Sequence, residues 1–211
     1  MNVELKKLVS KYPELGGCTS GIEEAFRLLV NSYRQGGKLL LCGNGGSAAD
    51  CEHIVGELMK GFVLKRPVDE QFRQQLKKVD PSEGEYMADH LQQALPAISL
   101  VSHTGLATAF ANDIAADMVF AQQVYGYGNK EDIVLGLSTS GNSKNVIKAM
   151  QVAKAMGLKT IGLTGESGGK MKEICDVTIQ VPWQETLEVQ ERHLPIYHAL
   201  CMMLEKEFFQ S

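Results

Sequence analysis

Five short apolar runs recur along the chain, and helical stretches separate most of them. Each run is rich in Leu, Ile or Val and has the length of a strand buried on both faces of a sheet. The runs occupy residues 38–42, 97–101, 133–137, 160–163 and 177–181. Residues 144–156 repeat apolar side chains at three- and four-residue steps, as an amphipathic helix does. The alternation predicts an α/β fold, with a mostly parallel sheet covered by helices on both faces.

Two further helices are predicted near the ends of the chain. Ser20 and Glu23 have the spacing of a capping box, and the helix that follows should end at Gly36. Its apolar residues, at helical spacing, are Ile22, Ala25, Phe26, Leu29, Val30 and Tyr33. The C-terminal helix contains Pro195, which is expected to bend or interrupt it.

Length favours a single domain. The 211 residues suffice for one α/β core and are too few for two full domains, so residues 1–211 are expected to fold together. Residues 68–94 interrupt the alternation of strands and helices because they are polar. Two short helices joined by a turn are expected there. We interpret this segment as an insertion near the mouth of the candidate functional site described below. It would be either a lid over that site or a solvated segment without a role.

Composition narrows the class of partner. A formal net charge of −4 gives no electrostatic reason to expect nucleic acid, and no segment has the roughly 20 apolar residues of a membrane helix. The five cysteines are scattered without a C-x-x-C pair, which favours free thiols in a reducing compartment. We therefore expect a cytoplasmic protein with a small-molecule partner.

Two strand–helix loops are candidate anion sites. The glycine loop, residues 43–47, contains Asn44, Gly45, Gly46 and Ser47. The serine loop, residues 138–143, contains Ser138, Thr139, Ser140 and Ser143. Backbone N–H groups and hydroxyls at a helix N-terminus suit a phosphate, and the absence of a Gly-Lys-Ser/Thr sequence argues against a nucleotide P-loop. The alternative is that each loop is only a turn or a helix cap.

Two groups of polar side chains lie on predicted helices. His53 and Glu57 are four residues apart and share one helix face, next to the glycine loop. Gln190 and His198 are eight residues apart, which is about 12 Å along a straight helix. Spacing alone does not establish a joint site for the second pair, and either group could be an ordinary surface or core feature.

These motifs together resemble the SIS-domain phosphoheptose isomerase family. The resemblance rests on the glycine loop with His53-x-x-x-Glu57, on Asn112-Asp113, on the serine loop, on residues 162–165, and on Gln190-Glu191 with His198. It covers the chain except for about residues 68–94, and it implies a doubly wound, flavodoxin-like, three-layer sheet of five mostly parallel strands. One departure is Lys60-Gly61, at a place where the family often has an arginine after a glycine.

The resemblance also implies roles for these residues. Glu57 and His198 would carry the acid–base chemistry, and one zinc ion per subunit would be held by His53, Glu57, Gln190 and His198. The two loops would hold the sugar phosphate, with Glu57, Gln190, Asn112 and Asp113 also contacting the substrate.

The activity expected from the resemblance is aldose–ketose isomerisation of sedoheptulose 7-phosphate to D-glycero-D-manno-heptose 7-phosphate through an enediol. The alternatives are a non-catalytic sugar-phosphate sensor, a module that binds a replication initiator, and an isomerase of another ketose phosphate. Fold alone does not separate these functions.

A homotetramer is the expected assembly. The helix around Ile22 and the C-terminal segment 200–204 offer more apolar surface than one sheet of this size needs. The resemblance adds that active sites lie at subunit contacts, which would relieve the spacing of Gln190 and His198. The alternative is that both helices pack on their own sheet.

Overall fold

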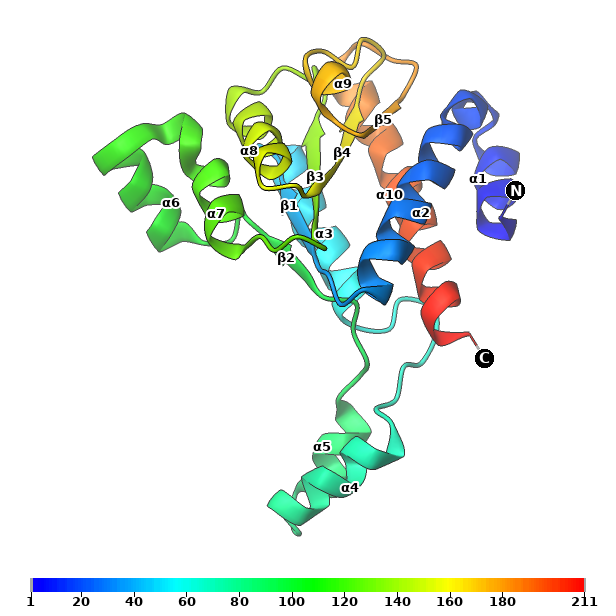
Figure 1. Cartoon of the computed structure of the whole chain (residues 1–211). Coiled ribbons are helices and arrows are strands. Elements are labelled where there is room, and N and C mark those ends of the chain that lie inside the picture. The colour runs from blue at the N-terminus through cyan, green and yellow to red at the C-terminus, as the bar shows by residue number, and fades with distance from the viewer. Residues whose placement is uncertain (1, 211) are drawn as a thin grey trace.

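A parallel five-stranded sheet forms the centre of the chain in a computed structural model that describes residues 2–210 (Figure 1). The strands lie in the order β2-β1-β3-β4-β5, and every neighbouring pair is parallel. They are β1 (Leu39–Cys42), β2 (Ala97–Ser99), β3 (Ile133–Ser138), β4 (Lys159–Thr164) and β5 (Val177–Gln180). All five apolar runs become strands, and the order 2-1-3-4-5 is that of a doubly wound sheet. The predicted fold is confirmed.

Helices cover both faces of this sheet (Figure 1). The α-helices are α1 (Val3–Lys11), α2 (Thr19–Arg34), α3 (Gly46–Met59), α4 (Glu70–Val79), α5 (Gly84–His90), α6 (Thr104–Phe110), α7 (Val119–Tyr127), α8 (Lys144–Ala155), α9 (Met171–Ile174) and α10 (Thr186–Phe209). Short 3-10 or π turns are η1 (Pro13–Cys18), η2 (Ala111–Ala115) and η3 (Ala116–Met118).

Alternate residues of each strand point into two separate cores. Leu39 and Leu41 of β1 join the cluster that α2, α3 and α10 complete. Leu40 and Cys42 join the cluster that α7 and α8 complete on the other face. Successive side chains of a strand point to opposite faces, so a strand buried on both sides must be apolar throughout. This explains why the strands appear as continuous apolar runs.

The capping box predicted at the start of α2 is wrong. The helix begins at Thr19, so Ser20 lies inside its first turn, and no side-chain cap bond is made. The 3-10 turn η1 runs directly into α2, and the Thr19 hydroxyl donates to the Gly16 carbonyl instead. A preceding turn therefore supplies partners that a capping side chain would otherwise provide. The helix does end before Gly36, whose φ of +79° suits glycine.

The apolar surplus proposed for α2 and α10 is also wrong. Ile22 is 0% exposed, Leu29 3%, Leu200 5% and Leu204 1% within a single chain. Their side chains belong to the same core cluster as the sheet, and α1 packs against α10 as an added layer. Both helices thus pack on their own sheet, and their burial gives no reason for self-association.

Helix α10 is continuous from Thr186 to Phe209, with Pro195 inside it. The predicted interruption at this proline is therefore wrong, and the alternative, a bend, stays a prediction. Pro195 is itself buried against the body of the protein, and packing along the whole length of α10 outweighs the loss of one backbone hydrogen bond.

The polar segment forms two helices, as predicted, but its expected position is wrong. The α4–α5 hairpin (residues 69–91) projects from the body at the amino ends of the strands, below α3 in Figure 1. Leu39 N–H, at the start of β1, donates to the carbonyl of Pro96, just after the hairpin. Both candidate loops leave the opposite, carboxyl ends of β1 and β3. The hairpin therefore does not cover the loops of its own chain.

Candidate active site

The glycine loop joins β1 to α3 in a backbone path that requires glycine. A Cβ on Gly43 would lie 2.7 Å from the carbonyl oxygen of Ser47, and Gly45 has a φ of +56°. The first N–H groups of α3 consequently stand at the carboxyl end of the sheet. Such groups, together with the helix dipole, favour an anion.

The serine loop stands beside it, between β3 and α8. The hydroxyls of Ser138 and Ser143 are 2.9 Å apart, and Ser140 Oγ accepts from the backbone N–H of Asn142 at 3.1 Å. Asn44 and Asn145 exchange two amide hydrogen bonds, 2.9 and 2.8 Å long, which join the glycine loop to the first turn of α8, directly after the serine loop. The parallel sheet thus brings two segments almost 100 residues apart to one place.

A polar cavity of about 260 Å³ opens between the loops. Its lining residues are Asn44, Gly45, Gly46, Ser47, Leu137, Ser138, Thr139, Ser143, Thr186 and Gln190. The fold therefore brings seven predicted substrate-binding residues of the two loops to one cavity, and Gln190 joins them from α10. Ser140 is the one predicted loop residue that does not line it. The cavity offers hydroxyls, amides and helix N-termini to an anion without any lysine or arginine in its lining.

Helices α3 and α10 run side by side in the same direction and form the α3–α10 seam. At its upper end a Cβ on Gly46 would meet Gln190 Nε2 at 2.6 Å. About two turns further, His53 meets His198, and beyond the end of α3 Glu205 binds the backbone N–H of Phe62. Residues eight apart on α10 therefore lie at different levels of the seam.

The middle of the seam holds His53, Glu57 and His198. His53 Nε2 is 3.2 Å from Glu57 Oε1 and 3.5 Å from His198 Nε2. Glu57 is 14% exposed, and its other oxygen is 3.4 Å from Lys60 Nζ. Burial, followed by the nearby charge of His53, lowers the pKa of His198. A half-buried carboxylate beside two imidazoles suits proton transfer.

These donor atoms also suit a zinc ion. Two ligands of tetrahedral zinc, with bonds of about 2.0–2.1 Å, stand about 3.3 Å apart, and the two distances of 3.2 and 3.5 Å lie close to that spacing. Between residues 2 and 210, however, no three His, Cys, Asp or Glu side chains are arranged as a complete metal site. The types of donor atom and these two spacings suit zinc, and Gln190 is not among the donors in a single chain because it lies beside Gly46.

Asp50 and Tyr197 belong to the same cluster, although the sequence did not point to them. The Tyr197 hydroxyl contacts Asp50 Oδ1 and His53 Nδ1, each at 3.0 Å. Burial raises the pKa of Tyr197 and of Asp50, and for Asp50 the bond from Tyr197 opposes the rise. The only available signal was position, since Asp50 precedes His53 by three residues on one helix face and Tyr197 adjoins His198.

Asn112 and Asp113 lie away from both the cavity and the seam. They are exposed on the turn η2, and Asn112 Nδ2 donates to Asp113 Oδ1 at 2.8 Å. The segment α6–η2 projects from the sheet at the left of Figure 1. A single chain therefore does not bring this pair to the other predicted residues, and its role in substrate binding stays a prediction.

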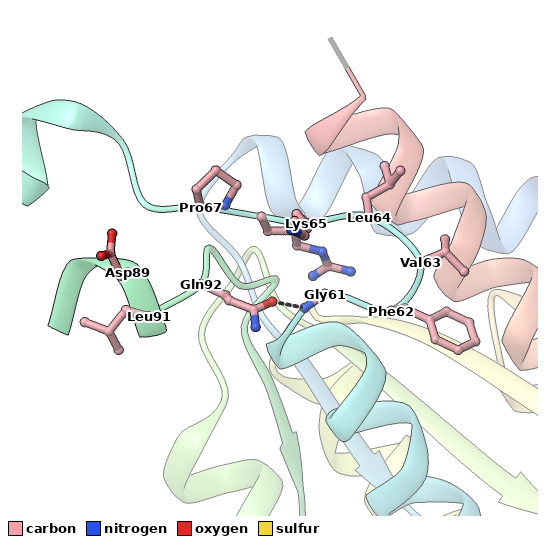
Figure 2. A pocket seen from close by; sticks show the side chains of 10 residues that line it. Gly61, Phe62, Val63, Leu64, Lys65, Pro67, Asp89, Leu91 and Gln92 are labelled. Carbon is pink, nitrogen blue, oxygen red and sulfur yellow. Dashed lines mark hydrogen bonds between the residues drawn. The ribbon is translucent and has the colours of Figure 1, made fainter. Parts of the chain in front are cut away.

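A larger cavity, of about 460 Å³, lies at the base of the hairpin (Figure 2). Figure 2 shows Gln92 accepting a hydrogen bond from the backbone N–H of Gly61, which is 2.7 Å long. The cavity is lined by residues 61–67 with Asp89, Leu91 and Gln92. It contains none of the predicted site residues and is remote from both loops.

Known proteins are similar to this chain in sequence and fold. A model of the SIS domain matches residues 17–90 and 86–165. The phosphoheptose isomerase of Rhodospirillum rubrum is 39% identical over 191 residues, covering 90% of this chain and 88% of that protein. The phosphoheptose isomerase of Helicobacter pylori is 39% identical over 204 residues, covering 97% and 90%.

Solved structures agree. A phosphoheptose isomerase from Francisella tularensis superposes with a TM-score of 0.73 at 28% identity, covering 97% of this chain and all of the other. The phosphoheptose isomerase of Neisseria gonorrhoeae gives a TM-score of 0.69 at 30% identity, covering 95% and 98%. From its sequence, its fold and the loops and side chains that the fold brings together, the chain belongs to the SIS-domain phosphoheptose isomerase family.

Proposed function

We propose that this enzyme converts sedoheptulose 7-phosphate into D-glycero-D-manno-heptose 7-phosphate. The observation that carries the proposal is the adjacency of a polar anion cavity and the His53–Glu57–His198 cluster along one seam. Membership of the phosphoheptose isomerase family supports the seven-carbon substrate. Neither relatives nor site favour a sensor or a protein-docking module, because binding alone does not need the cluster.

The phosphate would occupy the cavity between the two loops. Ser138, Ser143 and the first residues of α3, Gly46 and Ser47, line it. Gln190 lies at the same end of the seam, where its amide can bind the sugar. With the phosphate held there, the chain of the sugar can extend down the seam toward His53. This arrangement orients the open-chain substrate and restrains its movement.

Glu57 is the proposed base. It takes a proton from C1 of the ketose while the carbonyl oxygen on C2 gains one, which gives the enediol. Return of a proton to C2, with loss of the proton on O1, yields the aldose and restores both groups. The proton that O2 gains comes from O1 through His198: the neutral imidazole, which its lowered pKa keeps available near pH 7, accepts the O1 proton and passes it to O2, so His198 ends neutral.

Zinc is the proposed cofactor, held in one chain by His53, Glu57 and His198. A bound zinc ion would supply Lewis-acid polarisation of the substrate carbonyl. The donor spacings of 3.2 and 3.5 Å support this assignment. Gln190 would act as a fourth ligand only with a shift away from Gly46, so we assign it first to the substrate.

We further propose a cytoplasmic homotetramer. None of the helices within residues 2–210 is long and apolar enough to cross a membrane. All five cysteines are free thiols, four of them buried, which suits a reducing compartment. Exposed apolar residues away from the sheet core, including Ile114 and Leu187 at 70% exposure each, offer candidate surfaces for self-association.

A turnover assay in D₂O tests the function. The zinc-loaded chain should form the aldose from sedoheptulose 7-phosphate and place solvent deuterium on C2, because the proton that Glu57 takes from C1 exchanges with D₂O before a hydrogen is returned to C2. Ketose phosphates with five and six carbons, assayed in parallel, should react more slowly. Binding without turnover would support a sensor instead, and faster turnover of a shorter sugar would reassign the substrate.

A further inference from the structure

Tyr197 stands between Asp50 and His53, with its hydroxyl within hydrogen-bond distance of both. Its oxygen is 3.0 Å from Asp50 Oδ1 and 3.0 Å from His53 Nδ1. The residue is 1% exposed, and its ring meets the His53 ring edge-on with centroids 5.5 Å apart. The surrounding side chains therefore hold both the ring and the hydroxyl in one position.

The number of protons determines the direction of these bonds. A tyrosine hydroxyl has one proton, and a carboxylate can only accept. Tyr197 therefore donates to Asp50, and its oxygen accepts from the N–H at His53 Nδ1. Nδ1 keeps its proton, so Nε2 is the ring nitrogen left free. That nitrogen faces Glu57 Oε1 and His198 Nε2.

We propose that Asp50 and Tyr197 are positioning residues that hold His53 in its Nδ1–H form and direct the lone pair of Nε2 into the cluster. The inference rests on the proposed function, because it takes that cluster to be the reacting centre. Histidines that bind metals are held similarly through their second nitrogen, usually by a carboxylate or a carbonyl. Here a buried hydroxyl stands between the imidazole and the carboxylate.

This arrangement has a chemical consequence for the cluster. With Nε2 unprotonated, two acceptor atoms, Nε2 and Glu57 Oε1, face each other at 3.2 Å. They repel one another unless a cation or a proton lies between them. The Asp50–Tyr197 pair therefore prepares the centre for a positive charge, and its loss should weaken binding of a cation before it disturbs the fold.

The first test is the tautomer of His53 in the metal-free protein. Nitrogen-15 NMR at about pH 8.5, two units above the usual histidine pKa, distinguishes the Nδ1–H and Nε2–H forms, and His53→Gln assigns the signal. The wild-type chain should show Nδ1–H. Tyr197→Phe should shift His53 toward Nε2–H, the form that an unconstrained neutral histidine prefers. Tyr33→Phe is the matched control, because that buried hydroxyl lacks a partner within residues 2–210.

The second test is affinity for zinc alone, measured by competition with a chromogenic chelator. Loss of a hydrogen bond that orients a ligating histidine typically lowers metal affinity 10–100-fold. Tyr197→Phe should show a loss of this size, while Tyr33→Phe should bind as the wild type does. Thermal midpoints of the metal-free variants separate loss of orientation from loss of fold.

Asp50→Asn supplies the same test if Tyr197→Phe does not fold. The amide can donate to the Tyr197 oxygen, which frees the hydroxyl proton for His53 Nδ1, so the ring should again move to Nε2–H. An unchanged tautomer in the variants, or zinc affinity in Tyr197→Phe equal to that in Tyr33→Phe, would overturn the proposal. Neither measurement uses turnover. A chain with both shifts but no isomerase activity would therefore contradict only the proposed function.

Discussion

Arg66 and Glu205 form a fully buried ion pair that joins the segment after α3 to the C-terminal helix. Each side chain is 0% exposed, and Arg66 Nη2 lies 2.8 Å from Glu205 Oε1. The carboxylate also accepts from the backbone N–H groups of Phe62, Val63 and Leu64, while Arg66 donates to the carbonyls of Glu57 and Leu58. The pair thus fixes the lower end of the seam and the backbone of the proposed base.

Replacing Arg66 by Met should therefore destabilise the protein strongly. The change leaves Glu205 as an uncompensated buried charge, which typically costs 3–5 kcal/mol of unfolding free energy. Arg27→Met is the control, because Arg27 pairs with Glu24 on the surface and should cost at most about 1 kcal/mol. Urea unfolding measures both. Equal midpoints for the two variants would contradict the role of the buried pair.

Glu57→Gln should abolish turnover while leaving the fold intact. It removes the proposed base with little change in volume, so kcat should fall at least about 10²-fold. Glu52→Gln is a matched control on the same helix, where the carboxylate is exposed and accepts from Ser102. Steady-state kinetics with sedoheptulose 7-phosphate measures kcat for both variants. A folded Glu57→Gln enzyme with near-wild-type kcat would remove Glu57 from the mechanism.

Ser138→Ala combined with Ser140→Ala should raise the KM for the sugar phosphate more than it lowers kcat. Contacts to a remote phosphate act on bound substrate and transition state alike, so their loss is mainly a loss of binding. Ser20→Ala, on the exposed side of α2, should change neither constant. If kcat falls at unchanged KM, the serine loop has a task other than holding phosphate.

His193 should make the protein sensitive to acid. Burial lowers its pKa to about 4, although the nearby Thr164 carbonyl opposes the shift, and neither ring nitrogen makes a well-formed hydrogen bond within residues 2–210. The unfolded chain binds the proton with the ordinary pKa of about 6.5. Between these values the unfolded state holds more protons, so the free energy of unfolding falls as pH drops from 6.5 to 4, by about 3 kcal/mol in total.

His193→Leu should remove this share of the pH dependence. Urea unfolding at pH 7.5 and pH 4.5 should give a smaller difference for the variant than for the wild type, even if the variant is less stable at both. Acidic groups contribute equally to the two proteins and cancel in the comparison. An identical pH difference would mean that His193 does not stay neutral in the folded state.

The assembly in solution should be a tetramer. Light scattering at micromolar concentration should return a mass near four times 23.1 kDa. Ile114→Asp places a charge on the exposed projecting segment and should shift the population to smaller species. Val79→Asp, at the 83% exposed tip of the hairpin, is the control. A monomeric wild type would refute the assembly.

The strands and loops could be predicted because their signals are local. A strand buried on both faces must be apolar throughout, and β1 and β3 each lead into a loop whose glycines or hydroxyls suit a helix N-terminus. The proximity of His53 and Glu57 follows from helical spacing. The parallel topology then brings the two loops together, since both leave the carboxyl edge of the sheet.

The remaining features depend on packing that a single segment does not reveal. Tyr197 reaches His53 only because α10 lies parallel to α3, and the sequence does not specify that pairing. The same pairing places Gln190 beside Gly46 instead of among the donors. The helix α2 was predicted correctly, but its capping box was not, because η1 continues into the helix and replaces the cap.

The two ends of the α4–α5 hairpin leave the body together, where Pro67 and Gln92 form an antiparallel bridge. The chain leaves and re-enters the body at one point, so the sheet is little affected by the length of the segment between. The free-energy cost of closing the loop rises by only about 0.6 kcal/mol for each doubling of its length. A change in the length of this segment should therefore cost the sheet little free energy of folding. For an engineer it is a natural graft point, at which a reporter peptide or an affinity tag could replace residues 69–90 without entering the region where the sugar reacts.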